Sequence, residues 1–119
     1  MPPKDSSPEL PPGALELMVL RTLARGSNHG YGIARAIELA SGKALSIEEG
    51  SLYPALYRLE KRGDLKSEWG ITDANRKAKF YSLTPRGRAR LKEQTALWER
   101  LSTAVSRVLT DDPAPESAA

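Results

Sequence analysis

The sequence predicts a mainly helical protein with one two-stranded β-hairpin, and three observations predict it. Apolar side chains recur every three or four residues in four segments, which is the period of an amphipathic helix. In residues 65–69 and 79–83 the period changes to two, as in a strand with one buried face. Glycine or a helix-capping sequence separates the segments. With 119 residues, the chain has room for one small domain.

The first two predicted helices cover residues 14–25 and 30–40. The first is largely apolar and ends at Gly26. Either Ser27 or Asn28 can cap the start of the second helix, and Gly42 ends it. The two helices therefore meet at a tight turn. Their predicted core residues are Leu15, Met18, Val19, Leu20 and Leu23 in the first and Tyr31, Ile33, Ala34 and Ile37 in the second.

A third helix is predicted over residues 47–62. Ser46 and Glu49 have the spacing of a capping box at its start, and Gly63 can end it in the left-handed conformation. Pro54 lacks a backbone donor and clashes with the carbonyl four residues earlier, so it predicts a kink or a tight first turn. One face, expected in the core, carries Leu52, Leu56 and Leu59.

A hairpin and a long last helix follow. The strands 65–69 and 79–83 are joined by the polar, basic segment 70–78. Thr84 is a good N-cap, and Pro85 at the first helical position loses nothing by lacking an N–H. This helix is expected to run to about residue 109.

The last helix carries an apolar stripe with the alternating three and four spacing of a coiled coil. In so small a domain the stripe would be exposed to water, and a second copy of the chain would cover it. Alternatively, the helix folds back on its own core. The stripe consists of Leu91, Gln94, Trp98, Leu101, Val105 and Val108, widened by Leu97 and Leu109.

Composition excludes several classes of protein. The chain has no Cys, so disulfides and thiolate sites are excluded, and the single His, His29, cannot form a His cluster for a metal. No apolar run approaches the ~20 residues of a membrane-spanning helix, and the N-terminus has no apolar signal region. We expect no metal, no cofactor, no membrane partner and a cytoplasmic location.

The net charge of +3 is unevenly distributed. Residues 1–12 and 110–119 are acidic overall and rich in proline, and we expect both to be disordered tails. Residues 13–109 carry +7, and this excess lies entirely in residues 58–92, where eleven Lys or Arg face four acids. A polyanion such as nucleic acid is the favoured partner, although a charge run can also be a solvated face.

Three helices, a hairpin with a basic tip and a further helix follow the order of a winged helix-turn-helix. In that architecture the third helix enters the major groove of DNA and the wing lies on the backbone or in the minor groove. The charge excess covers these two elements. We therefore expect a DNA-binding domain over residues 13–84 and a C-terminal dimerisation helix over residues 85–109.

The chain also resembles the PadR-like transcriptional regulators over about residues 13–109. The resemblance is carried by four ordered motifs, GALEL at 13–17, HGYGI at 29–33, GSLYPALYRLE at 50–60 and KFYSLTPRG at 79–87. It implies a homodimeric, DNA-binding repressor whose C-terminal helix forms the dimer. The single helix after the wing is similar to the short branch of the family.

The exposed positions of the third helix and the wing are the predicted DNA contacts, because they supply hydroxyl and cationic donors. Tyr53 could instead pack against the wing, Tyr31 could be a core residue, and Arg58 could pair with an acid near Glu60. Three arginines at 86, 88 and 90 sit at a positive helix end, where cations are mildly unfavourable. An anion nearby would explain them, and surface solubility is the alternative. The predicted contacts are Tyr31, Ser51, Tyr53, Tyr57, Arg58, Lys61, Arg76, Lys77 and Lys79.

The predicted dimer interface lies on the last helix. Trp98 is the candidate for binding a flat aromatic effector at that interface, and its plainer role is in the dimer core. His29 has no catalytic partner in a recognisable motif and is interpreted as a capping or core residue. The interface residues are Leu91, Leu97, Trp98, Leu101, Val105 and Val108.

The favoured hypothesis is a homodimeric repressor that binds a pseudo-palindromic operator in double-stranded DNA and is released by a small-molecule effector. An alternative is a winged-helix adaptor that binds protein partners through its coiled-coil helix. An enzyme is disfavoured, because the sequence contains no catalytic constellation and no phosphate-binding loop.

Overall fold

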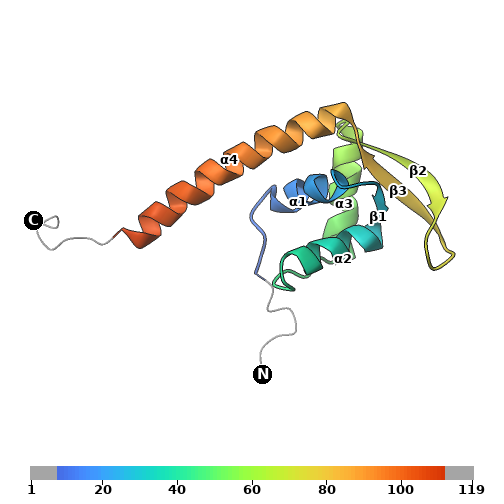
Figure 1. The fold of residues 1–119 in the computed structure, drawn as a ribbon, viewed down its shortest axis with the longest axis horizontal. Coiled ribbons are helices and arrows are strands. Elements are labelled where there is room, and N and C mark those ends of the chain that lie inside the picture. The colour runs from blue at the N-terminus through green and yellow to red at the C-terminus, as the bar shows by residue number, and fades with distance from the viewer. Residues whose placement is uncertain (1–7, 112–119) are drawn as a thin grey trace, which may run out of the picture.

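The computed structural model describes residues 8–111, and its fold is mainly helical with a small antiparallel sheet, as predicted (Figure 1). Helices α1, α2 and α3 pack together, the hairpin of β2 and β3 projects from them, and α4 extends away in the other direction. In chain order the elements are α1 (Ala14–Leu23), β1 (Asn28–His29), α2 (Gly30–Ala40), α3 (Glu49–Lys61), β2 (Leu65–Ile71), β3 (Lys77–Leu83) and α4 (Pro85–Thr110).

The sheet has three strands in the order β1-β3-β2 rather than the two predicted. Asn28 pairs with Tyr81 and His29 with Phe80, so the start of α2 is hydrogen-bonded to the wing. A strand of two residues has no period for a sequence to show. The hairpin strands also continue beyond residues 69 and 79, so the connecting loop is shorter than the predicted segment 70–78.

Helix α3 begins two residues later than predicted. Glu48, not Ser46, occupies the N-cap position, and Ile47 is buried in the core. The carbonyl of Glu48 accepts from the amides of both Ser51 (3.1 Å) and Leu52 (3.0 Å), which is the tight first turn expected before Pro54. Burial of Ile47 thus prevails over the local capping pattern. The other end is as predicted, with Gly63 at φ 85°.

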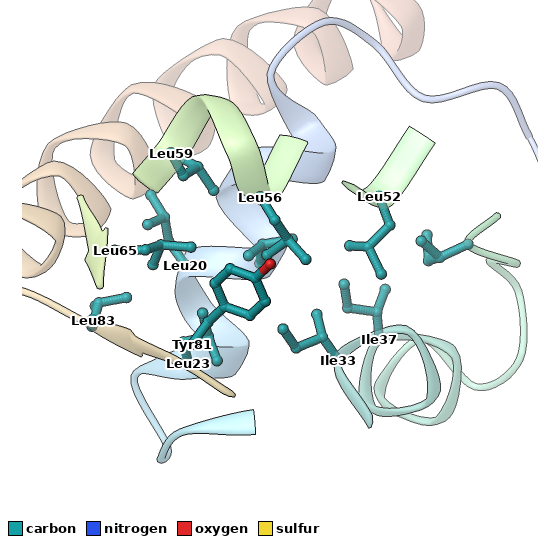
Figure 2. Packing of buried hydrophobic residues seen from close by; sticks show 12 residues of the cluster. Leu20, Leu23, Ile33, Ile37, Leu52, Leu56, Leu59, Leu65, Tyr81 and Leu83 are labelled. Atoms are coloured by element: carbon teal, nitrogen blue, oxygen red, sulfur yellow. The ribbon is translucent and has the colours of Figure 1, made fainter. Parts of the chain in front are cut away.

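The core lies between the three helices and the sheet. Figure 2 shows leucines and isoleucines of α1, α2 and α3 gathered around the ring of Tyr81, which comes from β3. The predicted inward face of α3 is confirmed, because its three leucines are among the most buried residues. Leu10, which falls in the predicted N-terminal tail, packs partly buried against this core. The rest of both predicted tails, residues 1–7 and 112–119, lies outside the described residues.

Helix α4 starts as predicted. Thr84 Oγ1 accepts from the amide of Gly87 at 3.0 Å and donates to the carbonyl of Gly63 at 2.6 Å, which ties the helix start to the end of α3. Gly87 is buried, and a Cβ there would lie 2.1 Å from the carbonyl oxygen of Asp64. The first turns of α4 pack on α1, and from Leu97 onward its large apolar side chains are exposed.

Candidate nucleic-acid interface

The exposed face of α3 carries a stripe of aromatic and cationic side chains. Tyr53, Tyr57 and Lys61 follow one another at intervals of four, so they lie in a row along the helix. Tyr57 is exposed, and Lys61 Nζ lies 5.7 Å from the centre of its ring. This contact holds a positive charge and a flat ring together at the end of the helix.

Arg58 lies on a different side of α3 and is bound to α1. Its Nε donates to Glu16 Oε2 at 2.8 Å, and Arg62 Nη2 donates to Glu16 Oε1 at 2.6 Å. Partial burial raises the pKa of Glu16, but the hydrogen bonds from Arg62 and Arg58 lower it more, so the pKa lies below its ordinary value. The acid that pairs with Arg58 is therefore on α1, 42 residues away, and not near Glu60.

A large hollow of about 1090 Å³ lies between the start of α2, the start of α3 and the wing. Five of the nine predicted DNA contacts line it: Tyr31, Tyr53, Arg76, Lys77 and Lys79. Ser51 and Arg58 border a separate cleft of about 650 Å³ beside the start of α1. The structure thus brings together predicted contacts from three elements that are distant in sequence.

The ring of Tyr53, on α3, lies directly against the backbone of Gly30 at the start of α2. A Cβ at Gly30 would lie 2.6 Å from Tyr53 Oη and 2.8 Å from Tyr53 Cζ, so the bare backbone lets the ring form one wall of the hollow. His29 caps α2, because its Nδ1 accepts from the amide of Gly32 at 3.3 Å, and its ring meets Phe80 edge-on at 5.2 Å. These contacts give His29, Gly30 and Gly32 of the HGYGI motif a structural role.

The wing cations differ in their partners. Lys77 Nζ lies 5.2 Å from the ring centre of Trp69, whereas Lys79 Nζ lies 3.6 Å from Glu60 Oε1. Burial, and after it the charge of Glu60, raises the pKa of Tyr81 at the floor of the hollow, so this phenol stays neutral. Lys79 is therefore partly neutralised within the chain, and Lys77 is held over an aromatic face.

Eleven of the sixteen residues that line the hollow were not among the predicted contacts, and Arg35 and Trp69 are two of them. Arg35 lies four residues after Tyr31 on α2, a helix for which Tyr31 was the only predicted contact. Trp69 pairs with Lys79 across the hairpin, so the period-two pattern of the strands placed both on one face and could have identified it.

The predicted dimer residues of α4 divide into two groups. Leu91 is partly buried against the core of its own chain, so the first turns of α4 do fold back as the alternative suggested. The other five remain exposed, with Trp98 at 41% and Val108 at 75%. The part of the α4 apolar stripe that remains exposed therefore starts at Leu97.

Asp64 connects α3 to α4. Its carboxylate is completely buried, with Arg90 Nε 2.8 Å from Oδ2, Arg62 Nε 3.6 Å from Oδ2 and Arg86 Nε 3.9 Å from Oδ1. Asp64 is thus an anion beside two of the three arginines at the start of α4, and Arg88 is exposed. These contacts join the end of α3 to the first turns of α4.

Comparison with known proteins agrees with the resemblance that the sequence motifs indicated. Residues 19–93 match the family model described as the transcriptional regulator PadR-like family. A transcriptional regulator of Mycobacterium tuberculosis is 35% identical over 92 residues, which cover 77% of this chain and 82% of that protein.

Solved structures agree. A PadR-family transcriptional regulator from Eggerthella lenta is 32% identical and superposes with a TM-score of 0.70, covering 84% of this chain and 85% of that one. A PadR-like regulator from Bacillus cereus is 26% identical with a TM-score of 0.72, covering 84% and 95%. Between residues 8 and 111, no helix is long and apolar enough to cross a membrane. Proteins of this family are transcriptional regulators and not enzymes, and this chain belongs to the PadR-like family of transcriptional regulators.

Proposed function

We propose that this protein is a homodimeric repressor that binds a pseudo-palindromic operator and acts in the cytoplasm, where the DNA is found. The observation that carries the proposal is the basic, aromatic hollow beside the exposed stripe of α3, because predicted contacts from α2, α3 and the wing meet there. Such a surface fits a duplex whose major groove receives α3 and whose backbone passes between α3 and the wing.

The residues have different roles in this arrangement. Tyr57 and Lys61 on the α3 stripe reach base edges and phosphates of the major groove. Arg76 and Lys77 in the wing neutralise phosphates, which contributes affinity and salt dependence but no choice of sequence. Arg58 and Lys79 keep their partners in the chain, Glu16 and Glu60, and reach phosphates only from their exposed sides.

The exposed part of α4 supports dimerisation. An α-helix rises about 1.5 Å per residue, so the part of α4 after Leu97 presents about 20 Å of unpartnered apolar stripe. A second copy packed on this stripe would bury it and relate two α3 helices by two-fold symmetry. The half-sites of the operator would then be about one helical turn apart, ~34 Å.

Trp98 is the proposed contact for a planar aromatic effector. It lies within the exposed stripe, so a flat ring could insert between the two copies and change the separation of the α3 helices. Tryptophan fluorescence should then respond to the effector, and the same compound should weaken operator binding. A Trp98→Leu variant should lose both responses, and a compound series that changes neither signal in the wild type would contradict this role.

The experiment that tests the function measures binding to the DNA upstream of the protein's own gene at rising salt. The wild type should bind more tightly than to random DNA, and log affinity should fall steeply with log salt. The variant Arg76→Ala/Lys77→Ala should reduce the slope by about two, since each phosphate contact contributes about 0.9.

A matched control keeps the net charge equal. Lys43→Ala/Arg107→Ala removes two exposed cations that do not line the hollow, and it should leave the slope unchanged. Equal affinity for operator and random DNA would defeat the repressor proposal and favour the adaptor, for which the α4 stripe would be the binding surface.

A further inference from the structure

The wing exposes two large apolar side chains on one face of β2. Trp69 is 65% exposed and Ile71 is 62% exposed, although side chains of this size are usually buried. Trp69 lines the hollow between the wing and α2, and Ile71 is not among the lining residues. Trp69 is therefore a candidate for contacting whatever occupies the hollow, and Ile71 is a control residue of similar exposure on the same strand.

The walls of the hollow combine flat rings and positive charges. Tyr31, Tyr53 and Trp69 contribute aromatic surface, and four cations outnumber the single carboxylate of Asp73. The cations are those of Arg35, Arg76, Lys77 and Lys79. Lys77 Nζ lies 5.2 Å from the centre of the Trp69 ring, so a ligand in the hollow could contact the cation and the ring at the same time.

An occupant that matches both features needs regularly spaced anions with apolar rings between them. A sugar–phosphate strand has this composition, because each phosphate is followed by a deoxyribose whose ring carbons are apolar. A uniformly acidic peptide would satisfy the cations but would leave the aromatic rings in water, because it has no apolar groups between its anions.

We propose that the hollow holds one sugar–phosphate strand of the DNA duplex and that the ring of Trp69 packs against a deoxyribose of that strand. The inference rests on the proposed DNA-binding function and adds to it a non-ionic contact in the wing. Lys77, held over the same ring, then reaches the adjacent phosphate.

The salt dependence separates the two kinds of contact. Packing against a sugar releases no counterions, so Trp69→Ala should weaken binding about tenfold at every salt concentration with an unchanged slope. Lys77→Ala should instead reduce the slope by about one. Trp69→Phe retains an aromatic ring and should recover most of the lost affinity.

A direct test observes Trp69 itself. The chain has two tryptophans, so Trp98→Phe leaves Trp69 as the sole emitter, and Trp69→Phe reports on Trp98 in the same way. Because the contact involves only backbone, a duplex of random sequence at low salt, about 50 mM, is a sufficient probe. We expect acrylamide quenching of Trp69 to fall at least twofold when the duplex binds. Ile71→Ala should change the affinity less than twofold.

The outcomes distinguish this inference from the proposed function. Unchanged quenching of Trp69 in a protein that binds the duplex would overturn the sugar contact and leave the repressor proposal standing. A parallel loss of affinity in Trp69→Ala and Ile71→Ala would overturn it as well, since a general disturbance of the wing would then account for both. Failure to bind any duplex would remove both proposals. Protection of Trp69 on duplexes that include no preferred site would support the contact even if no operator were found.

Discussion

The Nε of Arg90, on α4, lies 2.8 Å from Oδ2 of Asp64, which is completely buried where α3 passes into β2. A buried carboxylate is costly unless cations surround it, and removal of one partner leaves an uncompensated charge. Through this pair the helix proposed to form the dimer is attached to the end of the helix proposed to enter DNA.

We expect Arg90→Met to lower the free energy of unfolding by about 3 kcal/mol, because it leaves Asp64 buried with only the more distant Arg62 and Arg86. Urea denaturation followed by circular dichroism measures this. Arg88→Met is the matched control on the exposed side of the same turn, and it should change the stability by less than about 0.5 kcal/mol. Equal effects of the two substitutions would show that the buried pair is not a stabilising contact.

Gly87→Ala should also be strongly destabilising. Its Cβ would lie 2.1 Å from a backbone oxygen, that of Asp64, and backbone cannot rotate away as a side chain can. We expect a loss of about 3 kcal/mol in the same denaturation experiment. Gly50→Ala is the control, since a Cβ there meets nothing within 4 Å, and a helical Ala should stabilise the protein by about 0.5 kcal/mol. A stable Gly87→Ala protein would contradict the packing of α4 against the α3–β2 turn.

The stability contributed by Glu16 should depend on pH. The hydrogen bonds from Arg62 and Arg58 keep its pKa below the ordinary value of 4.5 in the folded state. A carboxyl group with a depressed folded pKa stabilises the protein above its unfolded pKa, and this stabilisation is lost as the pH falls through the folded pKa. Wild type should therefore exceed Glu16→Gln in free energy of unfolding at neutral pH, and the gap should start to close near pH 4.5.

Urea titrations of both proteins at a series of pH values measure this gap. Glu93→Gln, which removes an exposed carboxylate on α4, should remain within about 0.5 kcal/mol of wild type throughout. A gap between wild type and Glu16→Gln that stays constant through the acidic range would show that Glu16 does not act through its charge.

Leu101→Glu should separate the proposed dimer without unfolding the chain. The side chain lies on the exposed α4 stripe and outside the hydrophobic core cluster, but the charge would be buried between two copies. Light scattering after size exclusion should show a monomer, and operator affinity should fall by about 100-fold or more, because the two half-sites are no longer bound together.

Thr103→Glu introduces the same charge on the same helix outside the stripe and should remain dimeric. A dimeric Leu101→Glu protein would show that the stripe is not the interface. A wild-type protein that is itself monomeric at all concentrations would defeat the dimer proposal.

Most of the secondary structure could be predicted because its causes are local. The period of the apolar residues, the Thr84 cap and the Gly63 helix end involve residues within one or two turns of one another, and each predicts its element correctly. The predicted start of α3 was wrong because Ile47 is buried in the core. Its core contacts involve residues distant in sequence, so no local pattern indicates them. The strand β1 was missed because two residues carry no period.

The candidate site likewise has a part that could be predicted from the sequence and a part that could not. Residue type and helix position predicted the stripe of α3 and the wing cations, and the family resemblance was confirmed. The hollow could not be predicted, because its walls come from α2, α3 and the hairpin, and their distances depend on how these elements pack. The ion pairs of Glu16 with Arg58 and of Asp64 with Arg90 likewise join residues on different elements.

For this protein, the sequence alone was enough for the order and type of the main elements, the basic segment and the family, because these depend on composition and short-range periodicity. Folding determines which of the predicted side chains are free to meet DNA or a second copy. In the folded chain Arg58 is paired with Glu16, Leu91 packs partly buried against the core, and Trp69 remains exposed beside Lys77. The physical reason is that burial and ion pairing depend on distance in space, and residues far apart in the chain become neighbours only in the packed structure.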